Sequence, residues 1–115
     1  QHIEGVETVY RILKNGSGVA VSKGKTVTVH AKGSVLQTGV QFWSTHDAGV
    51  GPYTYKAGVG LVIKGWDRGC LGMKLGETRL LRIPAQEAYG AAGFPAWGIP
   101  ANSGLHFEIE LITIK

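Results

Sequence analysis

The chain has 115 residues, of which 43% are apolar and 17% charged, and it carries a formal net charge of +4. This length predicts one domain over residues 1–115, and the composition excludes a largely disordered chain. The twelve basic residues form no block of neighbouring charges, which argues against a nucleic-acid partner, and no apolar stretch is long enough to span a membrane. Cys70 is the only cysteine, so no internal disulfide can form, and a cytoplasmic, reducing compartment is expected.

Glycine supplies 18 of the 115 residues, and glycine-rich turn signals such as those at residues 15–18 and 75–76 separate short segments with strand character. In residues 26–31 and again in residues 105–111, apolar and polar side chains alternate, which is typical of antiparallel strands with one face exposed to solvent. The expected strands are Val6–Leu13, Thr26–Ala31, a run around Val40 and Phe42, Tyr53–Lys56, Thr78–Ile83 and Leu105–Leu111.

One segment, residues 61–70, does not fit a strand. Val62, Ile63 and Trp66 have helical spacing there. The charged side chains are expected to point away from this apolar stripe: Lys64, Asp67 and Arg68. A helix of two to three turns is not stable alone in water, so it must lie on the sheet, which predicts an α+β fold. Residues 90–104 contain glycines, prolines and Trp97 without any period and are expected to form a long ordered loop.

The common chemical motifs are missing. A dinucleotide-binding loop would need glycine at position 63, which is isoleucine, and a phosphate loop would need Gly-Lys-Ser/Thr where Lys64 precedes Gly65. The four histidines are far apart in sequence and show no metal-ligand spacing, so neither a metal nor a cofactor is expected. His30 and His106 fall on outward strand faces. A nucleophilic Cys–His pair is formally possible, but a buried, inert thiol fits Cys70 better.

Aromatic residues are the most unusual feature of the chain. The simplest explanation for them is a packed core, because aromatic side chains bury large apolar areas. Tyr89, however, opens the glycine-rich loop, where its hydroxyl is expected to point toward open space. An apolar pocket with a few polar groups is the usual form of a small-ligand site. The residues concerned are Phe42, Tyr53, Tyr55, Trp66, Tyr89, Phe94, Trp97 and Phe107.

Several motifs in one collinear order, from about Val6 to Ile114, resemble the FKBP family of macrolide-binding immunophilins, which are peptidyl-prolyl cis-trans isomerases. A helix that reads Val-Ile-x-Gly-Trp with Ala-Tyr-Gly about twenty residues later is the most specific part of the resemblance, which is closest to small single-domain plant and algal members. The motifs are VTVHAKG (27–33), FWST (42–45), VIKGWDRG (62–69), LGMKLGE (71–77), EAYGAAGFPAWGIP (87–100) and LHFEIEL (105–111).

The resemblance implies a five-stranded antiparallel half-barrel sheet wrapped around one short helix at about residues 62–70. It also implies that Trp66 forms the floor beneath a bound proline ring. The Tyr89 hydroxyl and the Ile63 backbone N–H would donate hydrogen bonds to ligand carbonyls, and two side chains would project from the long loop over the pocket mouth: Phe94 and Ile99. The apolar walls would be Phe42, Tyr53, Val62, Ile63 and Phe107.

Three departures from the family pattern lie at the pocket. Ala31 replaces the usual tyrosine, Trp43 replaces the usual aspartate, and the loop is about one residue longer near residues 96–98, with Phe94 at a site often held by histidine. These changes predict that FK506 or rapamycin binds with reduced affinity. The implied partners are proline-containing peptides and proteins and, through a bound drug, TOR kinase or calcineurin; a monomer is expected. The alternative is a non-catalytic module that binds proline segments or partner proteins.

Overall fold

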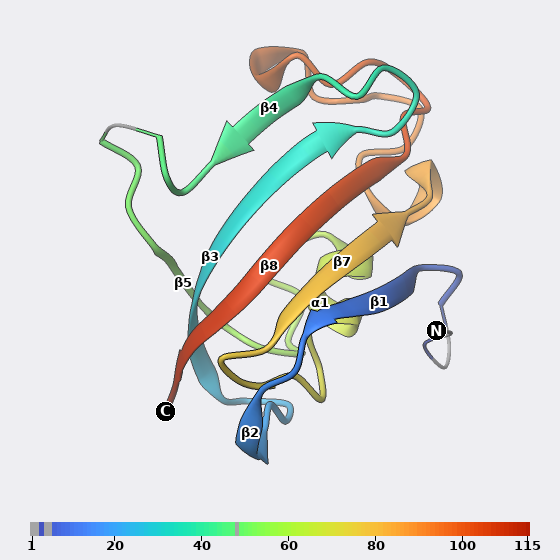
Figure 1. The fold of residues 1–115 in the computed structure, drawn as a ribbon. Helices are drawn as coiled ribbons and strands as arrows, with labels where there is room; N and C mark the ends of the chain where they lie inside the picture. The colour runs from blue at the N-terminus through green and yellow to red at the C-terminus, as the bar shows by residue number, and fades with distance from the viewer. Residues whose placement is uncertain (1–2, 4–5, 48) are drawn as a thin grey trace.

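The computed structural model describes residue 3 and residues 6–47 and 49–115 (Figure 1). Its main sheet is antiparallel and follows the order β1-β7-β8-β3-β4, with β5 also paired to β3. Because β8 pairs along one edge of β3, β4 and β5 share the other edge, β4 at residues 32–34 and β5 at residues 26–29. The six segments therefore occupy five positions in an open sheet, which confirms the predicted half-barrel. The strands are β1 (Val9–Lys14), β3 (Thr26–Val35), β4 (Gln41–Ser44), β5 (Tyr53–Lys56), β7 (Thr78–Ile83) and β8 (Leu105–Ile114).

A second, two-stranded sheet lies where the sequence predicted turns. It joins β2 (Ser17–Ala20) to β6 (Lys74–Leu75). Both strands are flanked or interrupted by glycine, so their sequences lack the alternation of apolar and polar residues by which the other strands were predicted. Val40 was also expected in a strand, but it lies in the irregular segment between the turn at residues 36–38 and β4, and it is exposed. The remaining elements are the helix α1 (Lys64–Gly69) and two 3-10 helices, Ala85–Glu87 and Pro95–Trp97. No helix in the described part of the chain is long and apolar enough to cross a membrane.

Helix α1 is shorter than the predicted 61–70, and of its three charged side chains Lys64 and Arg68 are exposed as expected, whereas Asp67 is not. Ile63 has an extended backbone with φ −55° and ψ 149°, so the helix begins after it. The Asp67 side chain, expected to face solvent, is buried, because its two carboxylate oxygens accept hydrogen bonds from the N–H groups of Gly58 and Gly60, each at 2.9 Å. This tertiary contact bends the chain into the helix, and so residues 61–63 form an irregular entry.

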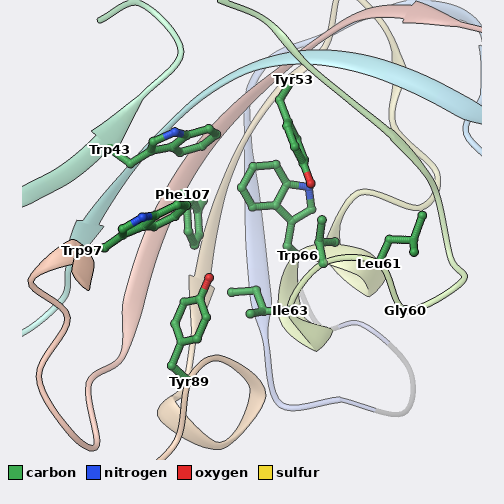
Figure 2. A pocket seen from close by; sticks show the side chains of 10 residues that line it. Trp43, Tyr53, Gly60, Leu61, Ile63, Trp66, Tyr89, Trp97 and Phe107 are labelled. Carbon is green, nitrogen blue, oxygen red and sulfur yellow. The ribbon is translucent and has the colours of Figure 1, made fainter. Parts of the chain in front are cut away.

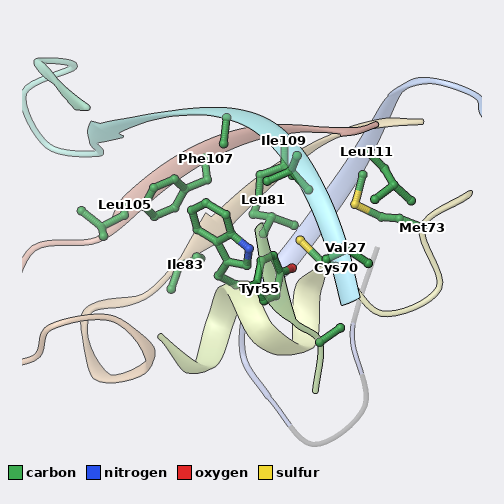
Figure 3. Close-up of a cluster of buried hydrophobic side chains, with 14 of the residues drawn as sticks. Val27, Tyr55, Cys70, Met73, Leu81, Ile83, Leu105, Phe107, Ile109 and Leu111 are labelled. Carbon is green, nitrogen blue, oxygen red and sulfur yellow. The ribbon is translucent and has the colours of Figure 1, made fainter. Parts of the chain in front are cut away.

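The helix lies unusually close to β7. An added Cβ at Gly65 would lie 2.5 Å from Cγ2 of Ile83, and one at Gly69 would lie 2.8 Å from Cδ1 of Leu81. Both distances are too short for a real side chain, so only glycine permits this approach. Figure 3 shows α1 beneath the buried side chains of the strands. Because the helix lies so close to β7, its remaining apolar residues and those of the sheet form one core.

Cys70 follows α1 and belongs to this core. Its side chain is 2% exposed, and burial raises the pKa of the thiol to about 12, so it stays protonated at neutral pH. The predicted buried thiol is therefore confirmed. Other members of the core shown in Figure 3 include Val27, Met73, Leu81, Ile83, Leu105, Ile109 and Leu111.

A buried arginine closes the C-terminal end of the helix. Arg79 occupies an inward position of β7 and is paired with the Glu77 carboxylate, so its charge is compensated. Its Nη1 donates hydrogen bonds to the carbonyl oxygens of Gly69 at 3.0 Å and Leu71 at 3.1 Å. These carbonyls lack partners within so short a helix, and the guanidinium satisfies them.

A second buried carboxylate fixes the segment that leads to Tyr89. Glu87 accepts hydrogen bonds from the N–H of Glu7 at 2.7 Å and from the N–H and hydroxyl of Thr8 at 2.8 and 2.6 Å. Burial alone would raise the pKa of the Glu87 carboxyl, but these hydrogen bonds outweigh burial and hold the pKa below its ordinary value of 4.5. The ionised form therefore ties residues 85–87 to the N-terminal part of the chain.

Replacing the Glu87 carboxylate tests how much these hydrogen bonds contribute to stability. Glu87→Gln is expected to lower the free energy of unfolding by about 1–3 kcal/mol, because the amide nitrogen faces N–H donors that it cannot accept from. Since the folded-state pKa is depressed, the stabilisation is present above about pH 4.5 and is lost as pH falls through the lower folded-state value. Urea unfolding from pH 7 to pH 3 should show a smaller loss of stability in the variant. Glu7→Gln, with an exposed side chain, is the control; equal pH profiles for Glu87→Gln and the wild type would contradict the assignment.

Candidate active site

An apolar cavity of about 430 Å³ opens between α1, the β4–β5 edge of the sheet and the loop after Tyr89 (Figure 2). This volume lies within the range of small-ligand sites. None of the described residues that line this cavity carries a charge. They are Trp43, Tyr53, Gly60, Leu61, Val62, Ile63, Trp66, Tyr89, Trp97 and Phe107.

Trp66 forms the floor of the cavity. Its side chain is only 4% exposed, and the Phe107 ring packs against the indole at 4.8 Å between centroids and 61° between planes. The indole N–H is buried and has no hydrogen-bond partner within the described residues. The floor therefore offers a bound group an aromatic surface.

The walls come from three different parts of the chain. Trp43 on β4 and Tyr53 on β5 each lie 5.9 Å from the Trp66 ring, at 50° and 75° between planes. Val62 and Ile63 form the wall on the helix side because the irregular entry to α1 turns them toward the cavity. Since these walls belong to strands and a pinned helix entry, the cavity is formed before any ligand arrives.

Gly33 makes room for the rings next to the floor. It lies on β3 opposite both Phe107 and Trp43. A Cβ at this position would lie 2.5 Å from Cε1 of Phe107 and 2.7 Å from Cζ of Phe42. The rings therefore lie over bare backbone, and any side chain at position 33 would displace them toward the cavity.

The polar groups at the cavity are few. Figure 2 shows the Tyr89 hydroxyl pointing into the cavity from the turn that follows the 3-10 helix Ala85–Glu87. Burial raises the pKa of Tyr89, and the nearby Tyr53 raises it further, so the hydroxyl remains a neutral donor at physiological pH. The two tyrosines are the only titratable side chains among the lining residues. The arrangement suits binding of a flat apolar group with one or two hydrogen bonds, and it offers no carboxylate or imidazole for proton transfer.

The structure brings seven of the residues proposed from sequence to the cavity, and the other four are not among the residues that line it. Phe42 packs edge-on against Phe107 at 5.7 Å, and Phe94 stacks on Tyr89 at 5.2 Å and 12°. Ile99, expected at the pocket mouth, is 2% exposed. Ala31 is buried on β3, where its N–H donates to the Thr45 hydroxyl at 2.9 Å.

Sequence reasoning did not assign three lining residues: Gly60, Leu61 and Trp97. Trp97 is the most informative of them. It ends the 3-10 helix Pro95–Trp97, and its indole remains 43% exposed. The sequence shows Trp97 as a large aromatic residue in a loop rich in glycine and proline. The loop has no hydrophobic periodicity, however, from which its position beside the floor could be predicted.

Two histidines that are distant in sequence meet outside this cavity. The His30 and His46 rings stack at 4.3 Å between centroids, and His30 Nδ1 lies 2.9 Å from the Thr45 hydroxyl. His30 is half-buried, so it is less exposed than its outward strand position suggested. Within residues 3, 6–47 and 49–115, no group of three or more His, Cys, Asp or Glu side chains is arranged to hold a metal ion.

Comparison with known proteins agrees with this geometry. Residues 18–112 match the family model of the FKBP-type peptidyl-prolyl cis-trans isomerases. The chain is 52% identical over 113 residues to the peptidyl-prolyl cis-trans isomerase FKBP12 of Vicia faba, covering 96% of this chain and 99% of that protein. With the same coverage of both chains it is 46% identical to FKBP12 of Arabidopsis thaliana and 47% identical to FK506-binding protein 1 of Dictyostelium discoideum.

The family match spans most of the chain, and these relatives are small proteins aligned over nearly their whole length. The half-barrel, the short helix and the cavity over Trp66 agree with the match, although Phe42, Phe94 and Ile99 do not line the cavity as the resemblance implied. The chain belongs to the FKBP-type peptidyl-prolyl cis-trans isomerase family and is a peptidyl-prolyl cis-trans isomerase.

Proposed function

We propose that residues 1–115 act as one isomerase domain, which binds an X–Pro segment with the proline ring on the Trp66 indole and the twisted amide within the apolar cavity. The observation that carries the proposal is the uncharged lining of aromatic and aliphatic side chains around a buried indole. Rotation about an X–Pro bond makes and breaks no covalent bond, so the step itself requires neither a nucleophile nor a cofactor.

The physical reason for acceleration is desolvation. The barrier, of about 20 kcal/mol, arises because the twisted amide loses its resonance. The planar amide is more dipolar than the twisted one, so transfer from water into an apolar pocket disfavours the planar form more strongly. Binding is then tighter in the transition state than in the ground state, which is the condition for catalysis. Tyr53, Val62 and Phe107 supply the dry surface in this account, and Phe42 supports Phe107 edge-on.

The remaining site residues orient the peptide. The Tyr89 hydroxyl and the Ile63 backbone N–H donate hydrogen bonds to peptide carbonyls on either side of the rotating bond. Phe94 supports Tyr89 through their stacked rings, and Ile99 anchors the loop that carries Phe94. Such orientation holds the proline ring over the floor while the preceding carbonyl group rotates about the X–Pro bond.

The same cavity is proposed to bind FK506- or rapamycin-type macrolides, with reduced affinity. At least five relatives are named FK506-binding proteins, which supports this ligand class. Trp43 puts an indole where the family usually has a carboxylate, and Ala31 supplies no hydroxyl. Through a bound macrolide, the protein would contact TOR kinase or calcineurin, as a cytoplasmic monomer.

Catalysis is tested by NMR exchange on a Leu-Pro peptide, which needs no coupling protease. We expect catalytic amounts of the wild-type protein to raise the cis–trans exchange rate well above the uncatalysed rate. Phe107→Ala should lower kcat/KM by at least about tenfold, because it opens the dry wall beside the floor. Val40→Ala, at an exposed position before β4, is the control, and near-UV circular dichroism shows whether each variant is folded. Exchange equal to the uncatalysed rate in the wild type would rule out the proposed activity, and peptide binding that survives in Phe107→Ala without catalysis would favour the binding-module alternative.

Macrolide affinity is tested separately by calorimetric titration of FK506. Trp43→Asp is expected to lower Kd by about tenfold, since it restores one charge-assisted hydrogen-bond acceptor at the rim. Trp43→Ala distinguishes the added carboxylate from the lost indole. Equal Kd values for the wild type and Trp43→Asp would show that the tryptophan compensates for the missing carboxylate.

A further inference from the structure

Two indoles stand side by side on the part of the cavity that faces away from Leu61 (Figure 2). The rings of Trp43 and Trp97 are nearly parallel, with 6.2 Å between centroids and 9° between planes. They come from β4 and from the loop of residues 94–99, which lie far apart in sequence, and both line the cavity. The pair adjoins the floor but extends beyond it: Trp43 lies 5.9 Å from the Trp66 ring, whereas Trp97 contacts Trp43 and the outer rings of Phe42 and Phe94.

The loop holds Trp97 firmly in spite of its exposure. Phe94 and Ile99 exchange backbone hydrogen bonds of 2.9 and 3.2 Å, and the Trp97 N–H donates to the Phe94 carbonyl at 3.0 Å. Gly98 closes the turn with φ 73°, a conformation that favours glycine. The Phe94 ring supports the indole edge-on at 5.2 Å. An indole that is 43% exposed is thus kept in a fixed position at the mouth of the cavity.

The indole pair lies within reach of the residue next to a proline bound on the floor. Consecutive Cα atoms are about 3.8 Å apart, and the Trp43 ring lies 5.9 Å from the Trp66 ring. When a proline ring occupies the floor, the side chain of an adjacent residue therefore reaches the indole pair. Flat aromatic side chains gain more from such a surface than aliphatic ones, because offset stacking and edge-to-face contacts add to area burial.

We propose that Trp97 and Trp43 form a second aromatic subsite, which selects proline segments with an uncharged aromatic residue next to the proline. The inference rests on the proposed function, since it needs the proline on Trp66. It names the substrate class of that site: polypeptides whose prolines are flanked by phenylalanine, tyrosine or tryptophan. No charged side chain among the described residues lines the cavity, so a cationic residue finds indole faces there but no counter-charge.

The test uses peptides that differ at one position. NMR exchange gives kcat/KM for Ala-Pro, Leu-Pro, Phe-Pro and Lys-Pro peptides, and for a peptide with phenylalanine after the proline. We expect phenylalanine on one flank to raise kcat/KM over alanine and leucine by about twofold to tenfold. Trp97→Ala should remove this advantage, so that kcat/KM falls about twofold to tenfold further for the phenylalanine peptides than for the Ala-Pro peptide. Trp97→Phe should restore part of it, and Leu61→Ala, at the opposite rim, should preserve it.

Several outcomes would overturn the subsite: no aromatic preference on either flank, a preference that survives in Trp97→Ala, an equal loss for all peptides, or a lysine peptide as the best substrate. Calorimetric binding of the same peptides separates this inference from the proposed function. If no peptide is isomerised, the proposed function fails, and a phenylalanine preference in Kd that Trp97→Ala abolishes still supports the subsite. The absence of that preference from both rate and binding contradicts it.

Discussion

The structure depends on how closely helix α1 approaches the sheet. A six-residue helix has no stability of its own, and it persists because one face packs against β7 without intervening side chains at Gly65 and Gly69. Arg79 satisfies the carbonyls at its C-terminal end, and Asp67 holds the loop before it. These contacts fix Trp66 inside the half-barrel. The floor of the cavity is therefore as rigid as the core to which it belongs.

The cavity follows from the same close packing. Gly33 lets the aromatic rings next to the floor approach β3, and strands β4 and β5, which share one edge of β3, each place an aromatic ring at the wall. Glu87 anchors the turn that directs Tyr89 inward. The charged side chains around the cavity form hydrogen bonds with backbone groups, whereas the faces of the aromatic rings remain available to a ligand. This division suits a reaction whose transition state is less polar than its ground state.

Much of the fold could be predicted from sequence because the alternating patterns of β3 and β8 reflect burial directly. The start of α1 could not be predicted, since Val62 and Ile63 fit the helical period but are held outside the helix by the hydrogen bonds that Asp67 accepts from the loop just before it. Trp66 and Tyr89 could be assigned through family motifs. The position of Trp97 depends on a tight loop closure and on ring contacts with β4, and neither leaves a periodic signal.

In the proposed mechanism the cavity accelerates rotation about the X–Pro bond by excluding water, without any proton transfer. The most direct measurement is kcat/KM for a Leu-Pro peptide across pH and in D₂O. A neutral Tyr89 and an uncharged lining predict a flat profile from about pH 5 to 8, with equal rates in H₂O and D₂O once viscosity is corrected. A bell-shaped profile, or rates about twofold or more lower in D₂O, would show a proton in flight and contradict this account.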